Sequence, residues 1–281
     1  MMRDKKAGTK ISYVLFLMVA VVYLAPLAVT LSNSFMSKWE VEKNYDTASD
    51  RYIDMNVIPE KVTLSQYSQL LIDSPVYLNM FWNSVKLVLP IVFGQLIVSV
   101  LAAYAFTVLK FRGKEVVFLF YIIVMLLPLQ VTLMPNYIVA DWLNIKESYL
   151  AIILPAVFNP FGVFLLRQYM KSMPPSYIEA AQMDGAGHGR ILWSVVLPMV
   201  KPGLAAVAML TLLDYWNLID QAVVFIQEAD KQPLSTFLAQ INSGELGLAF
   251  AGSTFYAVPV VLILFYGQDF LKKGIAITGM K

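Results

Sequence analysis

The stretch Glu179-Ala180-Ala181-Gln182-Met183-Asp184-Gly185 is polar and contains glycine, yet it lies between two long apolar runs. The prolines at 174–175 stop any helix before it, and Ser176 can cap a new helix. Gly185 can end that helix in the left-handed conformation that glycine tolerates. The pattern predicts a short helix lying outside the bilayer.

A second short apolar run, residues 191–196, follows and is closed by Pro198. The segment is therefore expected to form a helix, a glycine turn and a second helix. The small side chains of Ala180 and Ala181 let the first helix approach another surface closely, although alanine is also an ordinary helix former. A segment of this shape is typical of a docking element.

The composition places the chain in a membrane. Hydrophobic residues make up 58% of its 281 residues and charged residues only 14%, which is too apolar for a soluble domain of this length. The net charge of +2 gives no reason to expect a nucleic-acid partner. The chain has no cysteine and one histidine, His188, so thiolate chemistry is excluded and no metal site is expected. We interpret His188 as a solvated loop residue.

Six apolar segments are each near the ~20 residues needed to cross the hydrocarbon core. They predict an all-α, polytopic membrane protein with six transmembrane helices, near residues 11–32, 83–109, 116–139, 149–169, 203–225 and 251–271. The basic start of the first segment also suits a signal peptide. Its apolar core, however, is longer than the roughly 7 to 15 residues of a signal-peptide core.

The distribution of lysine and arginine predicts the orientation, because cytoplasmic loops carry an excess of both. Leaving Lys86 aside at a membrane boundary, fourteen of these residues lie on the side of the N-terminus and six on the other. Both termini and the loop of residues 171–200 are therefore expected in the cytoplasm. On the outer side, the loop of about residues 227–250 is rich in turn residues and is expected to reach toward a soluble partner.

The segment at 179–198 resembles the EAA loop of bacterial ABC importer permeases. That pattern is Glu-Ala-Ala, three residues, Gly, nine residues, an aliphatic residue, one residue and Leu-Pro. It is matched here by Glu179, Ala180, Ala181, Gly185, Val195, Leu197 and Pro198, with Val195 where Ile is commoner. Further matches point to the carbohydrate-importer branch, which contains the maltose-transporter permeases: Ala102-Ala103-Tyr104-Ala105-Phe106, Phe111-Arg112-Gly113, Asp184-Gly185-Ala186, Lys201-Pro202 and Trp216-Asn217.

The resemblance implies one transmembrane permease domain over residues 1–281, with the type I importer fold, in a bacterial inner or plasma membrane. It also implies a second, related permease, two cytoplasmic ABC ATPase subunits that hold ATP and Mg, an extracytoplasmic solute-binding protein and a sugar substrate. The loop of residues 176–198 would dock on the ATPase. The residues that the resemblance assigns to docking are Glu179, Ala180, Ala181, Asp184, Gly185, Leu197 and Pro198.

Two interpretations of Glu179 remain open. An exposed carboxylate on a docking helix is well placed for an arginine of a partner ATPase. Ser176 and Glu179 also have the spacing of a capping box, in which the glutamate bonds the backbone amide of the cap residue. The two roles are compatible.

The fifth predicted span carries a polar face. Asp214, Asn217 and Gln221 are spaced i, i+3 and i+7, which places them on one side of a continuous helix. Tyr215 and Trp216 flank them, and aromatic rings beside hydrogen-bonding groups suit a sugar. We therefore expect these five residues to line the translocation pathway. Alternatively, Asp220 and Gln221 lie at the outer interface and Asp214 pairs with a neighbouring helix.

Enzyme chemistry is not expected. Gly113-Lys114 is followed by Glu115 and lacks the glycine five residues earlier that a phosphate-binding loop needs. The chain is thus not expected to bind a cofactor, and ATP hydrolysis is expected in partner subunits. The alternative function is an ion-coupled carrier or intramembrane enzyme that uses Asp214 and Asp220, which would lie on different faces of one helix.

Overall fold

The computed structural model describes residues 2–45, 56–240 and 245–279, and all the regular elements within them are helical. The all-α prediction is confirmed. The chain divides into two compact units, residues 1–79 with 238–258 and residues 80–237 with 259–281. Each unit is described by itself.

The first unit contains the N-terminal helix α1 (Met2–Asn33) and the short helices α2 (Lys38–Tyr45), α3 (Ser65–Ser68) and η1 (Gln69–Asp73). Met36, Val41 and Leu70 are buried in this unit. The buried carboxylate of Glu40 accepts a hydrogen bond from the backbone amide of Glu60 at 2.6 Å. This bond links the two described parts of the polar segment after α1, which end at residue 45 and resume at residue 56.

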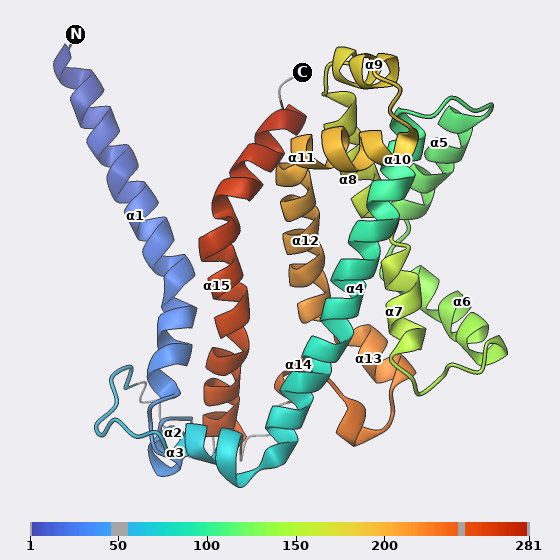
Figure 1. Ribbon diagram of the computed structural model, residues 1–281. Coiled ribbons are helices and arrows are strands. Elements are labelled where there is room, and N and C mark those ends of the chain that lie inside the picture. Colours follow the sequence, from blue (N-terminus) through green and yellow to red (C-terminus); the bar gives the residue numbers. More distant parts are fainter. Residues whose placement is uncertain (1, 46–55, 241–244, 280–281) are drawn as a thin grey trace. The chain divides into compact units, whose positions relative to one another are not determined.

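The remaining α-helices are labelled in Figure 1. Most of them belong to the second unit. In chain order the elements after η1 are α4 (Pro75–Thr107), α5 (Lys114–Met125), α6 (Leu129–Trp142), α7 (Leu150–Val157), α8 (Pro160–Lys171), α9 (Ser176–Met183), α10 (His188–Ile191), η2 (Leu192–Val196), α11 (Leu197–Met199), α12 (Lys201–Trp216), α13 (Asp220–Phe225), η3 (Ala229–Lys231), α14 (Leu234–Ala239) and α15 (Leu246–Gly279). α4, α14 and α15 each begin in one unit and end in the other.

Four helical segments are long and apolar enough to cross a membrane: Ser12–Asn33, Pro75–Thr107, Leu150–Lys171 and Leu246–Asp269. Two further spans follow if bent helix pairs are counted. α5 and α6 meet at 104°, and the helix over His188–Met199 meets α12 at 76°. The expected span at 116–139 is therefore bent at residues 126–128, and the helix in the expected span at 203–225 ends at Trp216.

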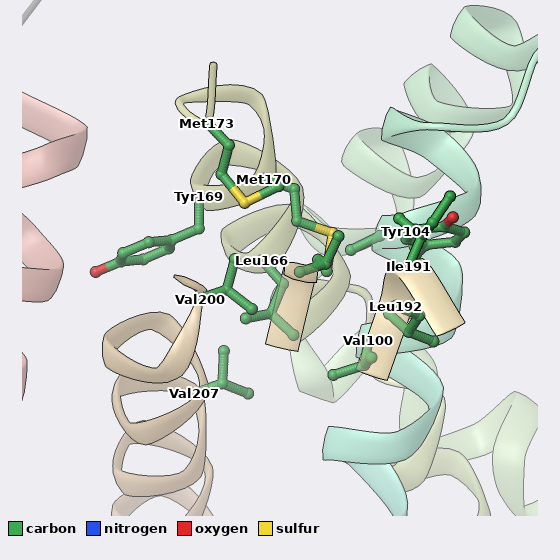
Figure 2. Close-up of a cluster of buried hydrophobic side chains, with 12 residues drawn as sticks. Val100, Tyr104, Leu166, Tyr169, Met170, Met173, Ile191, Leu192, Val200 and Val207 are labelled. Atoms are coloured by element: carbon green, nitrogen blue, oxygen red, sulfur yellow. The ribbon is translucent and has the colours of Figure 1, made fainter. Parts of the chain in front are cut away.

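A cluster of apolar side chains joins α4, α8, α10, η2 and α12 (Figure 2). Its buried members are Val100, Ala103, Tyr104, Leu166, Tyr169, Met170, Met173, Ile191, Leu192, Val196, Val200 and Val207. We call this set the anchor cluster. Close approach of α12 to α8 depends on Gly203, because a Cβ atom there would lie 2.7 Å from the ring of Tyr169. Small residues allow such close packing of helices in membranes.

Arg167 fastens α8 to the facing ends of α4 and α5. Its side chain is only 3% exposed, and its guanidinium donates to both carboxylate oxygens of Glu115 at 2.8 and 2.7 Å. It also donates to the backbone carbonyl of Phe106 at 3.3 Å and lies 3.6 Å from the ring centroid of Phe118. A buried arginine is tolerated because its charged group has a carboxylate, a carbonyl and an aromatic ring as partners.

Candidate functional site

The docking loop, residues 176–198, begins with α9, but its first turn differs from the prediction. Pro175 occupies the N-cap position, and no side chain caps the helix. Ser176 is the first helical residue, and the backbone amide of Glu179 bonds the carbonyl of Pro175 at 3.1 Å. The predicted capping box between Ser176 and Glu179 is therefore wrong, because proline at 175 starts the helix one residue earlier.

The glycine turn after α9 is confirmed. Gly185 has φ of +76°, the left-handed conformation that disfavours other residues. The amide of Ala186 bonds the carbonyl of Ala181 at 2.9 Å, and that of Gly185 bonds the carbonyl of Gln182 at 3.0 Å. These two bonds form a Schellman motif, which satisfies the last carbonyls of α9.

One face of α9 packs on the anchor cluster, and the other face is exposed to solvent. Ile178, Ala181 and Ala186 pack against the anchor cluster. Glu179 and Ala180 are exposed. Among the residues that the structure describes, the Glu179 side chain has neither a hydrogen bond nor an ion pair. Its carboxylate is thus available to a partner, which supports docking over capping.

The exposed face also carries apolar side chains that the sequence did not single out. Met183 is 89% exposed and Tyr177 is 54% exposed. Asp184, at the C-cap of α9, is exposed as well. Exposed apolar groups rimmed by polar ones are typical of protein contact sites. The signal in the sequence was the methionine at a position where a solvated helix would carry a polar residue.

The second helix of the docking loop does not end at Pro198. α10, η2 and α11 follow one another over His188–Met199, and Pro198 lies within α11. The turn at Leu192–Val196 is a π-helix, in which the amide of Leu197 bonds the carbonyl of Leu192. Proline has no amide to donate and its ring crowds the preceding turn. The widened π turn accommodates it, and Leu197 packs against the anchor cluster while Pro198 is exposed.

His188 is exposed as expected, but it also contacts a membrane helix. Its Nδ1 atom lies 3.0 Å from the hydroxyl of Tyr104 on α4, and the two rings meet edge to face. Tyr104 is a buried member of the anchor cluster. This hydrogen bond links the start of α10 directly to α4, a contact with no local signal in the sequence.

A cavity of about 630 Å³ lies among the broken helices of the second unit. We call it the pathway cavity. Its polar lining residues are Thr132, Asn136, Asn159, Asp214, Tyr215, Asn217, Asp220 and Gln221, and apolar residues of α5, α6, α7 and α8 complete it.

Three helix breaks meet at this cavity. They are the bend between α5 and α6, the gap between α7 and α8, and the gap between α12 and α13. Non-helical backbone at membrane depth is tolerated only where protein buries it or it lines a watery space. Asn159 stabilises one break: its Oδ1 accepts the amide of Phe161 at 3.0 Å, and its Nδ2 donates to the Tyr215 hydroxyl at 3.3 Å.

The predicted pathway residues are brought together by a route that differs from the prediction. Asp214, Asn217 and Gln221 do not share one continuous helix, because α12 ends at Trp216 and α13 begins at Asp220. All three nevertheless line the cavity, with Tyr215. The break also brings Asp220 to the same cavity as Asp214, so the expectation that these carboxylates lie on different faces is wrong.

Trp216 is placed elsewhere. It is buried, and its ring meets that of Phe81 on α4 edge to face at 5.8 Å. Thr132, Asn136 and Asn159 were missed by the sequence reasoning. For Asn159 a signal exists, since Asn followed by Pro is typical of a helix start inside an apolar run.

The first part of the predicted outer loop, at residues 227–230, is hydrogen-bonded to other residues of the second unit. The carboxylate of Glu147 accepts the amide of Gln227 at 2.8 Å, and Nδ2 of Asn83 donates to the carbonyl of Asp230 at 2.7 Å. The turn residues 241–244 lie outside the described residues. The expected contact of this loop with a soluble partner stays a prediction.

Comparison with known proteins places the chain among transport proteins. The family profile described as the inner membrane component of binding-protein-dependent transport systems matches residues 95–277. The arabinooligosaccharides transport system permease protein AraQ of Halalkalibacterium halodurans is 28% identical over 269 residues, covering 95% of this chain and 94% of that protein. The sn-glycerol-3-phosphate transport system permease protein UgpE of Yersinia enterocolitica is 32% identical over 164 residues, covering 58% and 57%.

Solved structures have the same fold. A chain from a bacterial ABC transporter involved in the import of the acidic polysaccharide alginate matches with a TM-score of 0.81 and 24% identity, covering 95% of this chain and 97% of that one. A chain of the bacterial alginate transporter in complex with an alginate pentasaccharide-bound periplasmic protein matches with a TM-score of 0.64 and 14% identity, covering 96% of each. The chain thus has the fold of these two transporter chains.

Proposed function

Because the chain belongs to the family of binding-protein-dependent transport system inner membrane components, we propose that it is the permease subunit of an ATP-driven importer for a sugar or oligosaccharide. The family is a membrane component of transport systems, so the expectation of a permease rather than an enzyme is confirmed. Its place in the inner membrane is confirmed as well.

The pathway cavity carries the proposal of a sugar substrate. Its side chains supply amide, hydroxyl and carboxylate groups among apolar ones, which suits a solute with polar edges and apolar C–H faces. The AraQ proteins of two bacilli support the same class, because both match nearly the whole chain and are named for arabinooligosaccharides. A second, related permease would complete the pathway around this cavity.

The docking loop supports the coupling mechanism. We infer that two cytoplasmic ATPase subunits bind ATP and Mg, and that one of them contacts the exposed face of α9. Because Ile178, Ala181 and Leu197 pack on the anchor cluster, a displacement of α9 would pass to α4, α8 and α12. Coupling requires contacts that differ between the inward-facing and outward-facing states. An extracytoplasmic solute-binding protein would deliver the sugar, with both termini of this chain in the cytoplasm.

The experiment that tests this function separates ATP-driven import from ion-coupled transport. The chain is purified with its co-purifying subunits, reconstituted in proteoliposomes, and assayed for sugar uptake with ATP inside, with and without a proton gradient. We expect uptake to require ATP and the binding protein and to persist when an uncoupler removes the gradient.

The rival function uses Asp214 and Asp220 as proton-relay groups. Both carboxylates line the same cavity, which is the arrangement that a proton relay between them would need. Uptake that continues without ATP but stops with the uncoupler would replace the proposal with the carrier.

A further inference from the structure

The charge of the pathway cavity restricts the class of solute that it admits. Asp214 and Asp220 both line it, and no lysine, arginine or histidine is among its lining residues in the part of the chain that the structure describes. The remaining polar groups are neutral at pH 7: one threonine, one tyrosine, and the amides of three asparagines and one glutamine. The only formal charges on this wall are therefore negative.

Neither carboxylate has a cationic partner in the described chain. Both side chains are exposed, and no described residue forms a hydrogen bond or an ion pair with either. Elsewhere in the same unit, acidic groups do have cationic partners: Asp141 pairs with Lys146 at 2.6 Å, Glu115 with Arg167 at 2.7 Å and Glu228 with Lys231 at 2.8 Å. By contrast, the two carboxylates at the pathway cavity have no cationic partner among the described residues, and they lie beside a space large enough for a solute.

Asp214 also lies within a candidate membrane span, the bent pair of His188–Met199 and Lys201–Trp216. It lies near the end of α12, roughly 20 Å along the helix from Lys201 at a rise of about 1.5 Å per residue. An ionisable group within such a span faces a water-filled space or a partner. At a low effective dielectric constant its field on a nearby charge is much stronger than in bulk water.

We propose that Asp214 and Asp220 give the pathway cavity a negative potential that excludes anionic solutes, so the substrate class is uncharged saccharides. This inference rests on the proposed function of the cavity as the pathway. Carboxylates accept hydrogen bonds from sugar hydroxyls and repel uronate or phosphate groups. The similar proteins named for an acidic polysaccharide or for glycerol phosphate would then differ from this chain in the charge of the corresponding wall.

The test uses the chain's lack of cysteine. A cysteine is introduced at Asn136, which lines the cavity, and a control cysteine at the exposed Ser65 in the first unit. In the assembled transporter, with and without ATP and vanadate, the rates of labelling of this chain by a cationic and an anionic methanethiosulfonate are measured. Each rate is divided by the rate for free cysteine.

We expect the Asn136→Cys thiol to favour the cationic reagent roughly tenfold or more, and the Ser65→Cys thiol to show a ratio near that of free cysteine. Adding Asp214→Asn and Asp220→Asn should bring the Asn136→Cys ratio close to the free-cysteine value. Labelling with an unchanged, solution-like ratio would overturn the charge inference while leaving the pathway intact. No labelling by either reagent in any state would instead remove the cavity from the pathway.

Discussion

The docking loop and the pathway cavity share helices α8 and α12 but are built in opposite ways. At the docking loop, apolar side chains from α4, α8, η2 and α12 fill the space between helices, and the polar groups are outside. At the cavity, helices break, and the polar groups turn inward around an open volume of about 630 Å³. A packed joint transmits displacement, whereas an open cavity changes its shape in response. The pairing of these two regions in one unit suits a transporter driven from its cytoplasmic side.

The largest effect is expected from breaking the joint at Gly185. Gly185→Leu forces a branched side chain into a backbone with φ of +76°, which costs roughly 1 to 2 kcal/mol and misdirects the chain after α9. We expect sugar uptake to fall more than tenfold at matched expression. The control is Gly187→Ala, because Gly187 has φ of −72° and nothing within 4 Å of an added Cβ. Equal uptake by the two variants would show that the turn is not needed for coupling.

Glu179→Gln tests the outer face of the joint. The change keeps the shape of the side chain and removes its charge, so loss of a charge-assisted bond to the ATPase should weaken association by roughly 1 to 3 kcal/mol. Co-purification of the ATPase and uptake are measured together. Ser176→Ala should be nearly silent, because Ser176 caps nothing. Wild-type association of the Glu179→Gln protein would leave Met183 and Tyr177 as the docking residues.

Asn217→Leu tests the cavity side of the comparison. Asn217 lines the cavity, and its Nδ2 donates to the carbonyl of Leu213 at 3.1 Å. Loss of a hydrogen-bonding group facing a polar solute should lower uptake roughly tenfold. ATPase association should be retained, since the docking loop is untouched. Val223→Leu, at an exposed position of α13 that does not line the cavity, is the control. Normal uptake by a well-expressed Asn217→Leu protein would assign Asn217 to helix packing.

The smallest effect is expected where the docking loop touches a membrane helix through one hydrogen bond. Tyr104→Phe removes the bond to His188 and keeps the ring in the anchor cluster. A single hydrogen bond contributes about 0.5 to 1.5 kcal/mol. We expect a modest loss of binding-protein-stimulated ATPase activity. His188→Ala should give the same loss, and the double variant no more than either, which a double-mutant cycle measures. Fully additive losses would separate the two residues.

The sequence predicted the parts that depend on local chemistry. Glycine at 185 has a φ preference of its own, and apolar runs of sufficient length predict spans in any context. The break after Trp216 could not be predicted, because no proline or glycine marks it and the spacing of Asn217 and Gln221 also fits the polar face of one continuous helix. Nor could the distant partners of Tyr104, Arg167 and Trp216, since contacts between helices depend on packing across the fold. The capping box failed because two start signals, Pro175 and Ser176, were adjacent.

Arg167 has a consequence for how the protein is made. Within the described residues, the groups that bond or stack on its guanidinium come earlier in the chain: the carbonyl of Phe106, the carboxylate of Glu115 and the ring of Phe118. During synthesis these groups leave the ribosome before the helix that carries the arginine. When α8 forms, the carboxylate, the carbonyl and the ring that contact its arginine have therefore already been synthesised. The order of the sequence thus means that the one buried cation of the described second unit does not wait for a later segment to supply its partners.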